Sequence, residues 1–503
     1  MKTDLMTIGL IGIPLVASPI IYLLGRWTAR TRRILGMSLA KLLSLLVLVV
    51  EGALLFLSVM VWTQGGTVKA TIGDVLVGLD GMGLMVGAIA VVLGFCVILF
   101  SFAYMKDENG EEKYYALLMA LIGSIIGLGC AQDLFNLWVW FELMAVSSFF
   151  LVAFYNEQPA SLEAGFKYLV QSALGSTLVL FGIAILFGIT GTVGLWNIWA
   201  TVSNHSPLVY VAGGLIVVGF GIKAALVPLH TWLPDAHSQA PSGISAMLSG
   251  IVIEAGLVAM LRSLSILAQS QFPAGTVLLV FGCINILFGN LLAFRQVEVK
   301  RLLAFSSVAQ VGYMLVGFGV AVLSSSYVAA AGGFFHMMTH AMMKGLAFLA
   351  AGAFLYVLHI GKGDHAPLVM DDLNGASRKY PVVAFFLSLA LLGLGGLPPM
   401  AGFMSKWQIL VATASVKSTL MICVIVFVAL NSVLSLGYYV PMINRMYRLT
   451  PSETVAAGMP VNWVMIVPMV ILTLGILAFG IWPGWANLLN YNAAASFLYP
   501  FGL

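Results

Sequence analysis

Apolar stretches long enough to cross a lipid bilayer follow one another along almost the whole of this chain. Of its 503 residues, 61% are hydrophobic and only 8% are charged. Soluble proteins carry about 25% charged residues. A soluble domain of this length could not bury so much apolar surface, so the sequence predicts an all-α polytopic membrane protein.

We expect fourteen transmembrane helices, each formed by a run of roughly 17 to 30 mainly apolar residues. The predicted spans are 6–24, 37–62, 80–104, 114–131, 133–155, 164–191, 208–230, 241–268, 275–294, 303–323, 327–358, 381–414, 418–444 and 461–488.

Basic residues fall mainly in alternate connections between these spans. Of the 23 Lys and Arg residues, sixteen lie in or next to odd-numbered loops, four lie at the N-terminus or in or next to even-numbered loops, and three lie deep inside spans. Cytoplasmic loops carry an excess of basic residues, so we expect the odd-numbered loops in the cytoplasm and both termini on the outer face. The sixteen are Arg26, Arg30, Arg32, Arg33, Lys41, Lys106, Lys113, Lys167, Arg295, Lys300, Arg301, Lys362, Arg378, Lys379, Arg445 and Arg448.

Six ionisable residues fall inside the predicted spans. An ionised side chain at the centre of a bilayer costs roughly 2.5–3.5 kcal/mol even on the lenient insertion scale. A chain with six such groups must keep them in a protected, hydrated interior, which makes them candidate functional residues. They are Glu51, Glu142, Lys223, Glu254, Lys344 and Lys406.

The segment GIKAALVPLHTWLPDAHSQAPS (221–242) places a helix breaker beside a buried lysine. Pro228 removes the backbone hydrogen bond to the carbonyl of Ala224, next to Lys223. Breaks of this kind are tolerated in membranes only where they line protein or a water-filled cavity. We therefore expect a discontinuous helix, with Lys223 able to exchange a proton. The alternative is a kinked helix whose lysine snorkels to the interface.

A second lysine, Lys406, follows another glycine- and proline-rich segment, LLGLGGLPPMAGFMS (391–405). The two broken spans, the seventh and the twelfth, are five spans apart. An odd offset predicts two five-helix repeats of opposite orientation, which is a signature of transporters. The expected parts are N-terminal helices 1–3 (1–113), a first repeat (114–268), a second repeat (275–444), and a C-terminal helix with its tail (461–503).

The buried acids need a partner or a proton. Glu142 is the only acid in its span, so it is either protonated or paired, and the alternative role is a neutral carboxyl bonded to a neighbouring helix. Glu254 lies near the middle of span 241–268, which follows the first broken span, and it could pair with Lys223. Both acids are therefore candidates for a proton pathway.

His336, His340 and Lys344 are spaced i, i+4 and i+8, so they share one face of a helix. Three titratable groups in line are typical of a proton relay. Two histidines at this spacing also fit a metal site, but the carboxylate pattern of a zinc protease is absent. We expect a relay and no metal.

Several other segments carry weaker expectations. We expect 191–199 to be a loop that returns to the membrane, and the His and Asp side chains of 359–381 to be solvated. Asp235 and His237 are expected to be solvated where the chain turns after the break. The four cysteines form no CxxC pair, so no iron–sulfur cluster or structural zinc is expected in this chain.

Five motifs together resemble the antiporter-like membrane subunits of respiratory complex I (NADH:quinone oxidoreductase). Those subunits are similar to the large subunits of Mrp sodium/proton antiporters and to subunits of membrane-bound hydrogenases. The resemblance implies fourteen core helices with two inverted five-helix repeats. The motifs are FE (141–142), KAALVPLHTWLPDAHSQAPS (223–242), VKRLLAFSSVAQVGYM (299–314), HMMTHAMMKGLAFLAAG (336–352) and GFMSKW (402–407).

The resemblance also implies roles for individual residues. Glu142 and Lys223 would form the interacting ion pair of a first half-channel. Lys300 and His340 would connect the two halves, with Lys344 beside them. Lys406 would be the terminal group of the second half-channel.

Two features depart from the family pattern. Many relatives have Lys or His where this chain has Glu254, which changes the polarity of the central connection. The long C-terminal extension of the largest complex I member is also not expected after residue 488. The resemblance therefore implies a shorter member, of the middle or innermost complex I kind or a hydrogenase or Mrp equivalent.

The function implied by the resemblance is proton translocation driven by electron transfer elsewhere in a complex. Loss of the attraction of Glu142 would release the proton of Lys223, which would pass through Lys300 and His340 to Lys406. A Coulomb step at about 4 Å is worth about 4 kcal/mol at an effective dielectric constant of 20.

The resemblance places the chain in an energy-transducing membrane, such as the prokaryotic plasma membrane. Flavin and iron–sulfur clusters would belong to partner subunits, and the net charge of +4 does not suggest nucleic acid. Two other functions stay open. One is a sodium/proton antiporter subunit without redox drive, and the other is a self-sufficient solute carrier.

Overall fold

The computed structural model describes residues 2–29, 38–64, 68–106, 108–202 and 207–502. Arg30, Arg32 and Arg33, which belong to the predicted basic loops, lie outside this part of the chain. The α-helices are α1 (Lys2–Ala29), α2 (Leu39–Thr63), α3 (Gly81–Tyr104), α4 (Glu111–Cys130), α5 (Leu134–Val152), α6 (Pro159–Thr190), α7 (Leu195–Thr201), α8 (Pro207–Lys223), α9 (Trp232–Gln239), α10 (Ser242–Met247), α11 (Ile253–Ser265), α12 (Ala274–Ala293), α13 (Val299–Ser324), α14 (Tyr327–Leu358), α15 (Pro381–Gly395), α16 (Ala401–Ala414), α17 (Thr419–Arg448), α18 (Glu453–Ala456), α19 (Trp463–Ile481) and α20 (Asn487–Leu498).

Long apolar helices confirm the predicted class, an all-α integral membrane protein. Within the described ranges, twelve helices are long and apolar enough to cross a membrane. Two shorter apolar helices, Pro207–Lys223 and Pro381–Gly395, are the first halves of the predicted broken spans. The count of fourteen spans, the two inverted repeats and the division into four parts stay predictions.

A β-hairpin that the sequence analysis did not anticipate connects α2 to α3. Strands β1 (Val68–Ile72) and β2 (Val75–Leu79) pair antiparallel, with Val68 opposite Leu79. An isolated bridge joins Val77 of this hairpin to Ala131, directly after α4. These residues lie in the connection between the predicted spans 37–62 and 80–104, and runs of only five residues do not show by periodicity that they form strands.

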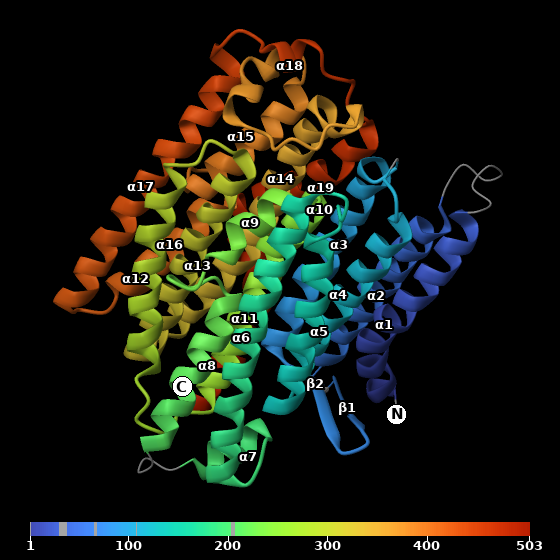
Figure 1. The fold of residues 1–503 in the computed structure, drawn as a ribbon. Helices are drawn as coiled ribbons and strands as arrows, with labels where there is room; N and C mark the ends of the chain where they lie inside the picture. Colours follow the sequence, from blue (N-terminus) through green and yellow to red (C-terminus); the bar gives the residue numbers. More distant parts are fainter. Residues whose placement is uncertain (1, 30–37, 65–67, 107, 203–206, 503) are drawn as a thin grey trace.

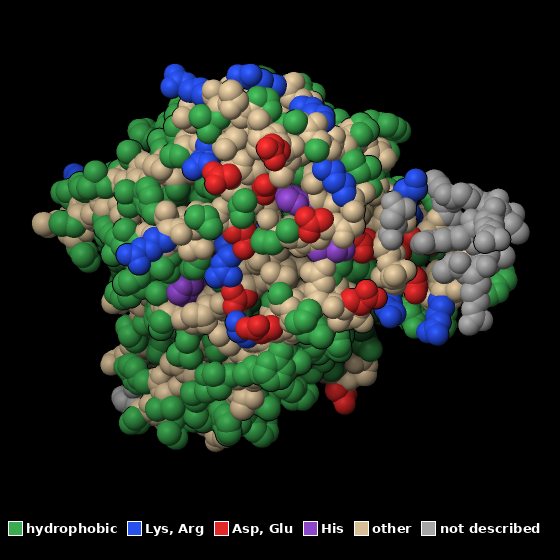
Figure 2. All heavy atoms as spheres, turned by 45° about the horizontal axis from the view of Figure 1, so that its top comes forward, with side chains coloured by type: hydrophobic (Ala, Val, Ile, Leu, Met, Phe, Trp, Pro, Cys, Tyr) green, Lys and Arg blue, Asp and Glu red, His purple; other side chains and the backbone are tan. Residues whose placement is uncertain are grey.

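The helices lie side by side in a bundle whose two ends differ (Figure 1). One end carries the hairpin and α7, and both chain termini lie toward this end. The other end, turned forward in Figure 2, gathers Lys, Arg, Asp, Glu and His side chains between hydrophobic flanks. This polar end is hereafter called the basic face, because it includes Lys167, Arg301 and Lys362 from three of the predicted basic loops.

The centre of the bundle is formed by α13, α14 and the continuous helical segment Ser242–Ser265. The most apolar window of this last segment is completely buried, and those of α13 and α14 are 89% buried. A π-helical stretch, Leu248–Val252, interrupts the segment one residue before α11, next to Glu254. Extra residues of this kind are frequent at functional sites. Glu254, Lys300, His336, His340 and Lys344 thus lie on the most deeply buried helices, whereas Glu51, Glu142, Lys223 and Lys406 lie on other helices.

Glycine residues let the central helices approach closely. A Cβ added to Gly312 of α13 would lie 2.6 Å from the carbonyl oxygen of Gly282 on α12. A Cβ added to Gly219 of α8 would lie 2.5 Å from the carbonyl oxygen of Gly175 on α6. Small residues at such crossings are typical of membrane helix pairs. The bundle is therefore held together by backbone contact as well as by side-chain packing.

The first predicted break is present. Helix α8 ends at Lys223, and Ala225 adopts a left-handed conformation with φ of 56°. Asn285 of α12 accepts a hydrogen bond from the backbone N–H of Val227 at 2.8 Å and donates to the carbonyl of Ala225 at 3.2 Å. Asn285 therefore supplies the partners that the unwound backbone lacks, as a break inside a membrane requires.

The second predicted break separates α15 from α16. Helix α15 ends at Gly395. Gly396 follows with φ of +82°, a left-handed backbone conformation that glycine adopts without strain. Lys406 Nζ donates to the carbonyl oxygen of Leu394 at 2.8 Å. A cation at the C-terminal end of a helix satisfies a free carbonyl and complements the helix dipole. Lys223, the last residue of α8, lies at the corresponding end of its own half-helix.

Two expectations about loops need correction. Segment 191–199 is not simply a loop, since Leu195–Thr201 form helix α7. In the segment 359–381, His359 is buried rather than solvated, with ring nitrogens 3.1 Å from Asp364 and 3.2 Å from Asp372. The N–H of Ala366 and the imidazole of His359 lower the pKa of Asp364 below its ordinary value. This loop is a folded cap on the basic face.

We predict that Arg262→Leu destabilises the protein by about 2–3 kcal/mol, because it leaves Asp80 without its partner. Arg262 donates two hydrogen bonds of 2.8 Å to the Asp80 carboxylate and one of 3.0 Å to the carbonyl of Gly129. The Asp80 side chain is 31% exposed, which places the loss below that of a fully buried pair. Thermal unfolding in detergent measures it. Asp74→Asn, on the exposed hairpin turn, is the control, and equal stability of both variants would contradict the prediction.

Candidate functional site

Lys223 lies in a cage of neutral groups. Its Nζ donates to the hydroxyls of Ser148 on α5, at 3.2 Å, and of Tyr168 on α6. The ammonium also lies 4.4 Å from the centre of the Tyr168 ring, which stacks on Trp232 at 4.0 Å. Aromatic faces attract cations. The aromatic pair and the two hydroxyls together hold a lysine side chain that is almost completely buried.

Glu142 does not form a hydrogen-bonded ion pair with Lys223. No oxygen of Glu142 lies within 4 Å of a basic nitrogen in the described residues, and Glu142 Oε1 is buried without a hydrogen-bond partner there. The two groups are still near enough to interact electrostatically. Their predicted functional pairing stays a prediction, and the structure places it across a gap rather than in contact.

Glu254 pairs with His340 rather than with Lys223. Glu254 Oε1 of α11 lies 2.7 Å from His340 Nδ1 of α14, and both side chains are fully buried. The sequence-based idea of a Lys223–Glu254 pair is therefore wrong for this conformation. The reason is helical register, because α11 presents Gly256 to Lys223. A Cβ added to Gly256 would lie 3.0 Å from the Lys223 Cβ.

A chain of contacts leads from His340 to Lys406. The rings of His340 and His336, one turn apart on α14, have centroids 6.4 Å apart. His336 Nε2 lies 3.0 Å from Gln310 Oε1, and Gln310 Nε2 donates to the Leu394 carbonyl at 3.0 Å. The same carbonyl accepts from Lys406 Nζ. The relay predicted on α14 is thus joined to the second broken helix through Gln310.

Ser405 provides a second connection between these helices. Its hydroxyl lies 2.8 Å from His336 Nδ1 and accepts a hydrogen bond from the Thr339 hydroxyl at 3.1 Å. Since Ser405 precedes Lys406 on α16, both ring nitrogens of His336 have partners that lead toward Lys406. His336 is therefore held from two sides in a fully buried position.

Lys344 and Lys300 are connected through the central helix α13, because Lys344 binds atoms of this helix and Lys300 is one of its residues. Lys344 Nζ donates to the carbonyl of Leu303 at 2.7 Å and to the hydroxyl of Ser306 at 2.6 Å. Lys300 Nζ, at the start of α13, donates to the carbonyls of Ser238 and Ala240 at 3.3 and 2.5 Å. Leu303 is three residues from Lys300, so the carbonyl that Lys344 binds lies about 5 Å from Lys300 along the axis of α13.

Asp235 and His237, which follow the first break, are not both solvated as expected. His237 of α9 is fully buried, its ring stacks on Phe348 with centroids 4.6 Å apart, and neither ring nitrogen has a hydrogen-bond partner among the described atoms. Asp235 is partly exposed, but it forms ion pairs with Lys167 and Arg301. Helix α9 turns inward after the break, which buries His237 and leaves Asp235 at the rim.

The structure therefore joins four of the predicted site residues. Glu254, His340, His336 and Lys406 form one linked line, hereafter called the buried line. Glu51 on α2 is not part of it, and both its carboxylate oxygens are buried without partners among the described residues. Of the predicted relay on α14, His336 and His340 lie in this line while Lys344 binds Leu303 and Ser306 instead, and the relay itself stays a prediction.

Several neutral side chains in this network were missed by the sequence analysis. They carry no charge, and isolated Ser, Tyr, Asn or Gln residues in apolar helices usually make local hydrogen bonds. Their presence in quoted motifs was a signal, because Gln310 and Ser306 lie in 299–314. The missed residues are Ser148, Tyr168, Asn285, Ser306, Gln310 and Ser405.

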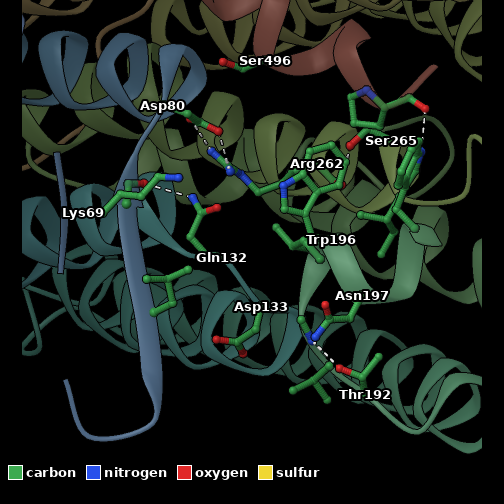
Figure 3. A pocket seen from close by; sticks show the side chains of 18 of the residues that line it. Lys69, Asp80, Gln132, Asp133, Thr192, Trp196, Asn197, Arg262, Ser265 and Ser496 are labelled. Atoms are coloured by element: carbon green, nitrogen blue, oxygen red, sulfur yellow. Dashed lines mark hydrogen bonds and ion pairs between the residues drawn. The ribbon is translucent and has the colours of Figure 1, made fainter. Parts of the chain in front are cut away.

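A separate cavity of about 800 Å³ lies between the hairpin and α7, at the end of the bundle opposite the basic face. Figure 3 shows the side chains that line it. Its wall includes the Arg262–Asp80 pair, Gln132 and Asp133. None of the predicted site residues lines it. Its size therefore does not make it the site of the chemistry that the buried ionisable groups indicate.

Two broken helices, each with a buried lysine beside the break, and a line that joins one buried carboxyl to two histidines agree with the class of antiporter-like membrane subunits. The chain belongs to the NADH:quinone oxidoreductase/Mrp antiporter transmembrane family, whose pattern matches residues 131–435. This range contains the buried line and both breaks. The resemblance found in the sequence motifs is confirmed.

Relatives of known name are similar over most of their length. The F(420)H(2) dehydrogenase subunit N of Methanosarcina mazei is 31% identical over 428 residues, 84% of this chain and 85% of the relative. The NADH-quinone oxidoreductase subunit N of Desulfitobacterium hafniense is 34% identical over 352 residues, 67% of this chain and 69% of the relative.

Solved structures share the fold from end to end. A chain of the archaeal membrane-bound sulfane sulfur reductase superposes with a TM-score of 0.86 at 26% identity, covering 98% of each chain. A chain of the Mrp complex of Dietzia sp. gives 0.84 at 22% identity, covering 99% and 98%. A chain of respiratory complex I from Thermus thermophilus gives 0.75 at 25% identity, covering 96% and 99%. All three are parts of membrane complexes.

We predict that Glu254 and His340 stabilise the fold as a coupled pair. Glu254→Leu and His340→Leu each leave one buried polar group without its partner, which costs roughly 1–3 kcal/mol. The double variant is expected to lose less than the sum of the two, by about 1 kcal/mol or more. Thermal unfolding of the unmodified protein, the two single variants and the double variant in detergent gives this double-mutant cycle. The control pairs Glu254→Leu with Ser388→Ala, whose hydroxyl bonds within its own helix. Additive losses for Glu254 and His340 would contradict the pairing.

Proposed function

We propose that this chain is the proton-translocating subunit of a redox-driven pump of the complex I type. The observation that carries the proposal is the buried line, in which a carboxyl, two imidazoles, an amide and an ammonium follow one another across the centre of the bundle. Relatives named as subunits of F(420)H(2) dehydrogenase and NADH-quinone oxidoreductase support it. Ionisable groups inside membranes mark ion pathways and proton relays.

The first step is the release of a proton at Lys223. Its cage of two hydroxyls and an aromatic face stabilises the ammonium without a carboxylate in contact. The charge of Lys223 therefore depends on the more distant Glu142, whose carboxyl has no fixed partner among the described residues. A change of charge beside Glu142 would shift the balance at Lys223, since electrostatic interactions are strong in a low-dielectric interior.

The second step is passage through the centre. Lys223 contacts α11 next to Gly256. Its proton would therefore move to the pair formed by Glu254, also on α11, and His340 on α14. A carboxyl and an imidazole 2.7 Å apart can exchange a proton directly. From His340 the proton would pass to His336 and then to Lys406 at the open end of α15, with Gln310 positioning both through its bonds to His336 Nε2 and to the Leu394 carbonyl that Lys406 also binds.

Electron transfer takes place elsewhere under this proposal. In the part of the chain that the structure describes, no cluster of three or more His, Cys, Asp or Glu side chains could hold a metal ion. Flavin and iron–sulfur clusters would be in partner subunits, and other membrane subunits would contact this chain. We propose a prokaryotic plasma membrane as the location, with the basic face in the cytoplasm and both termini outside.

We predict that Lys223→Ala lowers proton translocation by the whole assembly at least tenfold per electron transferred, because about 1.4 kcal/mol of lost stabilisation already gives a factor of ten. Glu142→Gln is expected to act in the same direction. Proton uptake by everted vesicles, measured with electron transfer, tests both. Lys417→Ala, on an exposed loop, is the control. Undiminished proton stoichiometry in both Lys223→Ala and Glu142→Gln would exclude this path.

We predict that Gln310→Leu slows proton translocation about tenfold while the complex still assembles, because it removes the link between His336 and Lys406. The same vesicle assay measures the rate, and copurification of the subunits measures assembly. Ser388→Ala is the matched control, since its hydroxyl bonds only to the carbonyl of Ala384 in its own helix. An unchanged rate for Gln310→Leu would remove Gln310 from the pathway.

The related antiporter function gives a different result in the same vesicles. Proton flux that depends on sodium and needs no electron donor would identify a sodium/proton antiporter subunit. This alternative is considered because the fold is shared with a chain of the Mrp complex. Activity of the purified chain alone would instead identify a solute carrier. Proton flux that requires both electron transfer and partner subunits supports the proposal.

A further inference from the structure

The buried line needs an opening to one side of the membrane. His336, His340 and Glu254 have no exposed surface, and Lys223 and Lys406 are 1% and 5% exposed. Lys300 is the member of the predicted set that lies nearest the basic face, because it is in the first turn of α13. Its surroundings therefore decide whether water can reach the interior from that face.

A small cavity lies directly beside Lys300. Its volume is about 20 Å³, and a site of roughly 10–15 Å³ is enough for one water molecule. The wall contains the polar side chains of Ser238, Gln239 and Gln158, so a water there would have partners. Tyr104, Tyr155 and His365 also line it. The cavity joins an ionisable buried residue to a polar, titratable wall.

Lys300 has a donor left for this cavity. An ammonium group offers three N–H donors, and two of them point to the carbonyls of Ser238 and Ala240. The structure gives no third protein acceptor within hydrogen-bond distance in its described part. Glu298, two residues earlier and partly exposed, adds a negative charge near Lys300. The site therefore holds a cation with one free donor next to an acidic neighbour.

His365 lies at the outer side of the cavity. It belongs to the loop between residues 363 and 369 on the basic face and is partly exposed. Its ring packs edge-on against Tyr155 with centroids 4.8 Å apart, and its Nδ1 is buried without a hydrogen-bond partner among the described residues. An imidazole with one nitrogen turned inward and a ring reaching the surface can transfer protons between the two sides.

The inner side of Lys300 leads toward the buried line. Lys344 binds the carbonyl of Leu303, one turn along α13 from Lys300. His237 lies near enough to Lys300 and Lys344 to interact electrostatically with both, and its two ring nitrogens are unbonded to described atoms. Lys344 is in turn on the helix face of His340 and His336. Titratable groups that interact electrostatically, without hydrogen bonds between them among the described atoms, thus lie between the cavity and the relay.

We infer that the cavity beside Lys300 is the opening through which protons enter the buried line from the basic face, with His365 as the transferring group at its mouth. This inference rests on the proposed function. Lys300 first gives a proton inward by way of His237 and Lys344, and its neutral amine then takes a proton from a water in the cavity, to which His365 delivers a proton from the basic face.

Accessibility of introduced cysteines tests the opening without any measurement of pumping. In the assembled complex with Cys423→Ser, Ser238→Cys is treated with a membrane-impermeant methanethiosulfonate ammonium reagent in vesicles of each orientation. We expect labelling from the basic face only, slowed about tenfold by His365→Trp. Asn197→Cys, in the opposite cavity, is expected to label only from the other face, and Ser124→Cys, fully buried in α4, is expected not to label.

Chemical rescue tests the role of His365. We expect His365→Ala to lower the proton translocation rate several-fold, and imidazole added on the basic face to restore it, while Lys362→Ala leaves the rate unchanged. If Ser238→Cys does not assemble, Gln239→Cys replaces it. Labelling of the cavity cysteine from the opposite face only, or a loss in His365→Ala that imidazole does not restore, would overturn the inference.

The inference and the proposed function fail in different ways. If Lys223→Ala and Glu142→Gln pump normally while Ser238→Cys labels from the basic face, the proposed function fails although the opening exists. If both variants stop pumping but the cavity cysteine is inaccessible from the basic face, the function stands and the entrance at Lys300 is wrong.

Discussion

Every buried lysine in the candidate pathway is held by neutral oxygen atoms. Lys223 binds two hydroxyls, Lys344 and Lys406 each bind one carbonyl and one hydroxyl, and Lys300 binds two carbonyls. No carboxylate of the described chain lies within ion-pair distance of any of them. A buried charge without a counterion is costly, so its protonation responds strongly to charges that are near but not in contact.

This constraint accounts for the second helix break and for the end of α9, whereas Lys223 at the first break binds two hydroxyls. A continuous helix uses all its internal carbonyls, whereas a broken one leaves carbonyls free at its C-terminal end. Lys406 takes one of these at Leu394, and Lys300 takes the carbonyls that end α9. Asn285 repairs the remaining backbone at the first break. The glycines and prolines thus end helices where buried lysines need acceptors, and the close helix crossings hold the helix ends and the lysines in place.

The sequence predicted the helical membrane class, the two breaks and the face shared by His336, His340 and Lys344. These depend on local chemistry, such as proline geometry and helical periodicity, which short segments display. It did not predict the Glu254–His340 pair or the link through Gln310. Both depend on the rotation and register of helices far apart in the chain, which periodicity does not specify. His237 was placed in solvent for the same reason, because the inward turn of α9 is a tertiary feature.

The central claim is that protons cross this subunit along the buried line and leave at Lys406. The most direct measurement is the number of protons moved per electron pair by vesicles carrying the assembled complex with Lys406→Ala, with electron transfer followed in the same sample. The account predicts a lower proton-to-electron ratio while electron transfer continues. A ratio equal to that of the unmodified complex would contradict it.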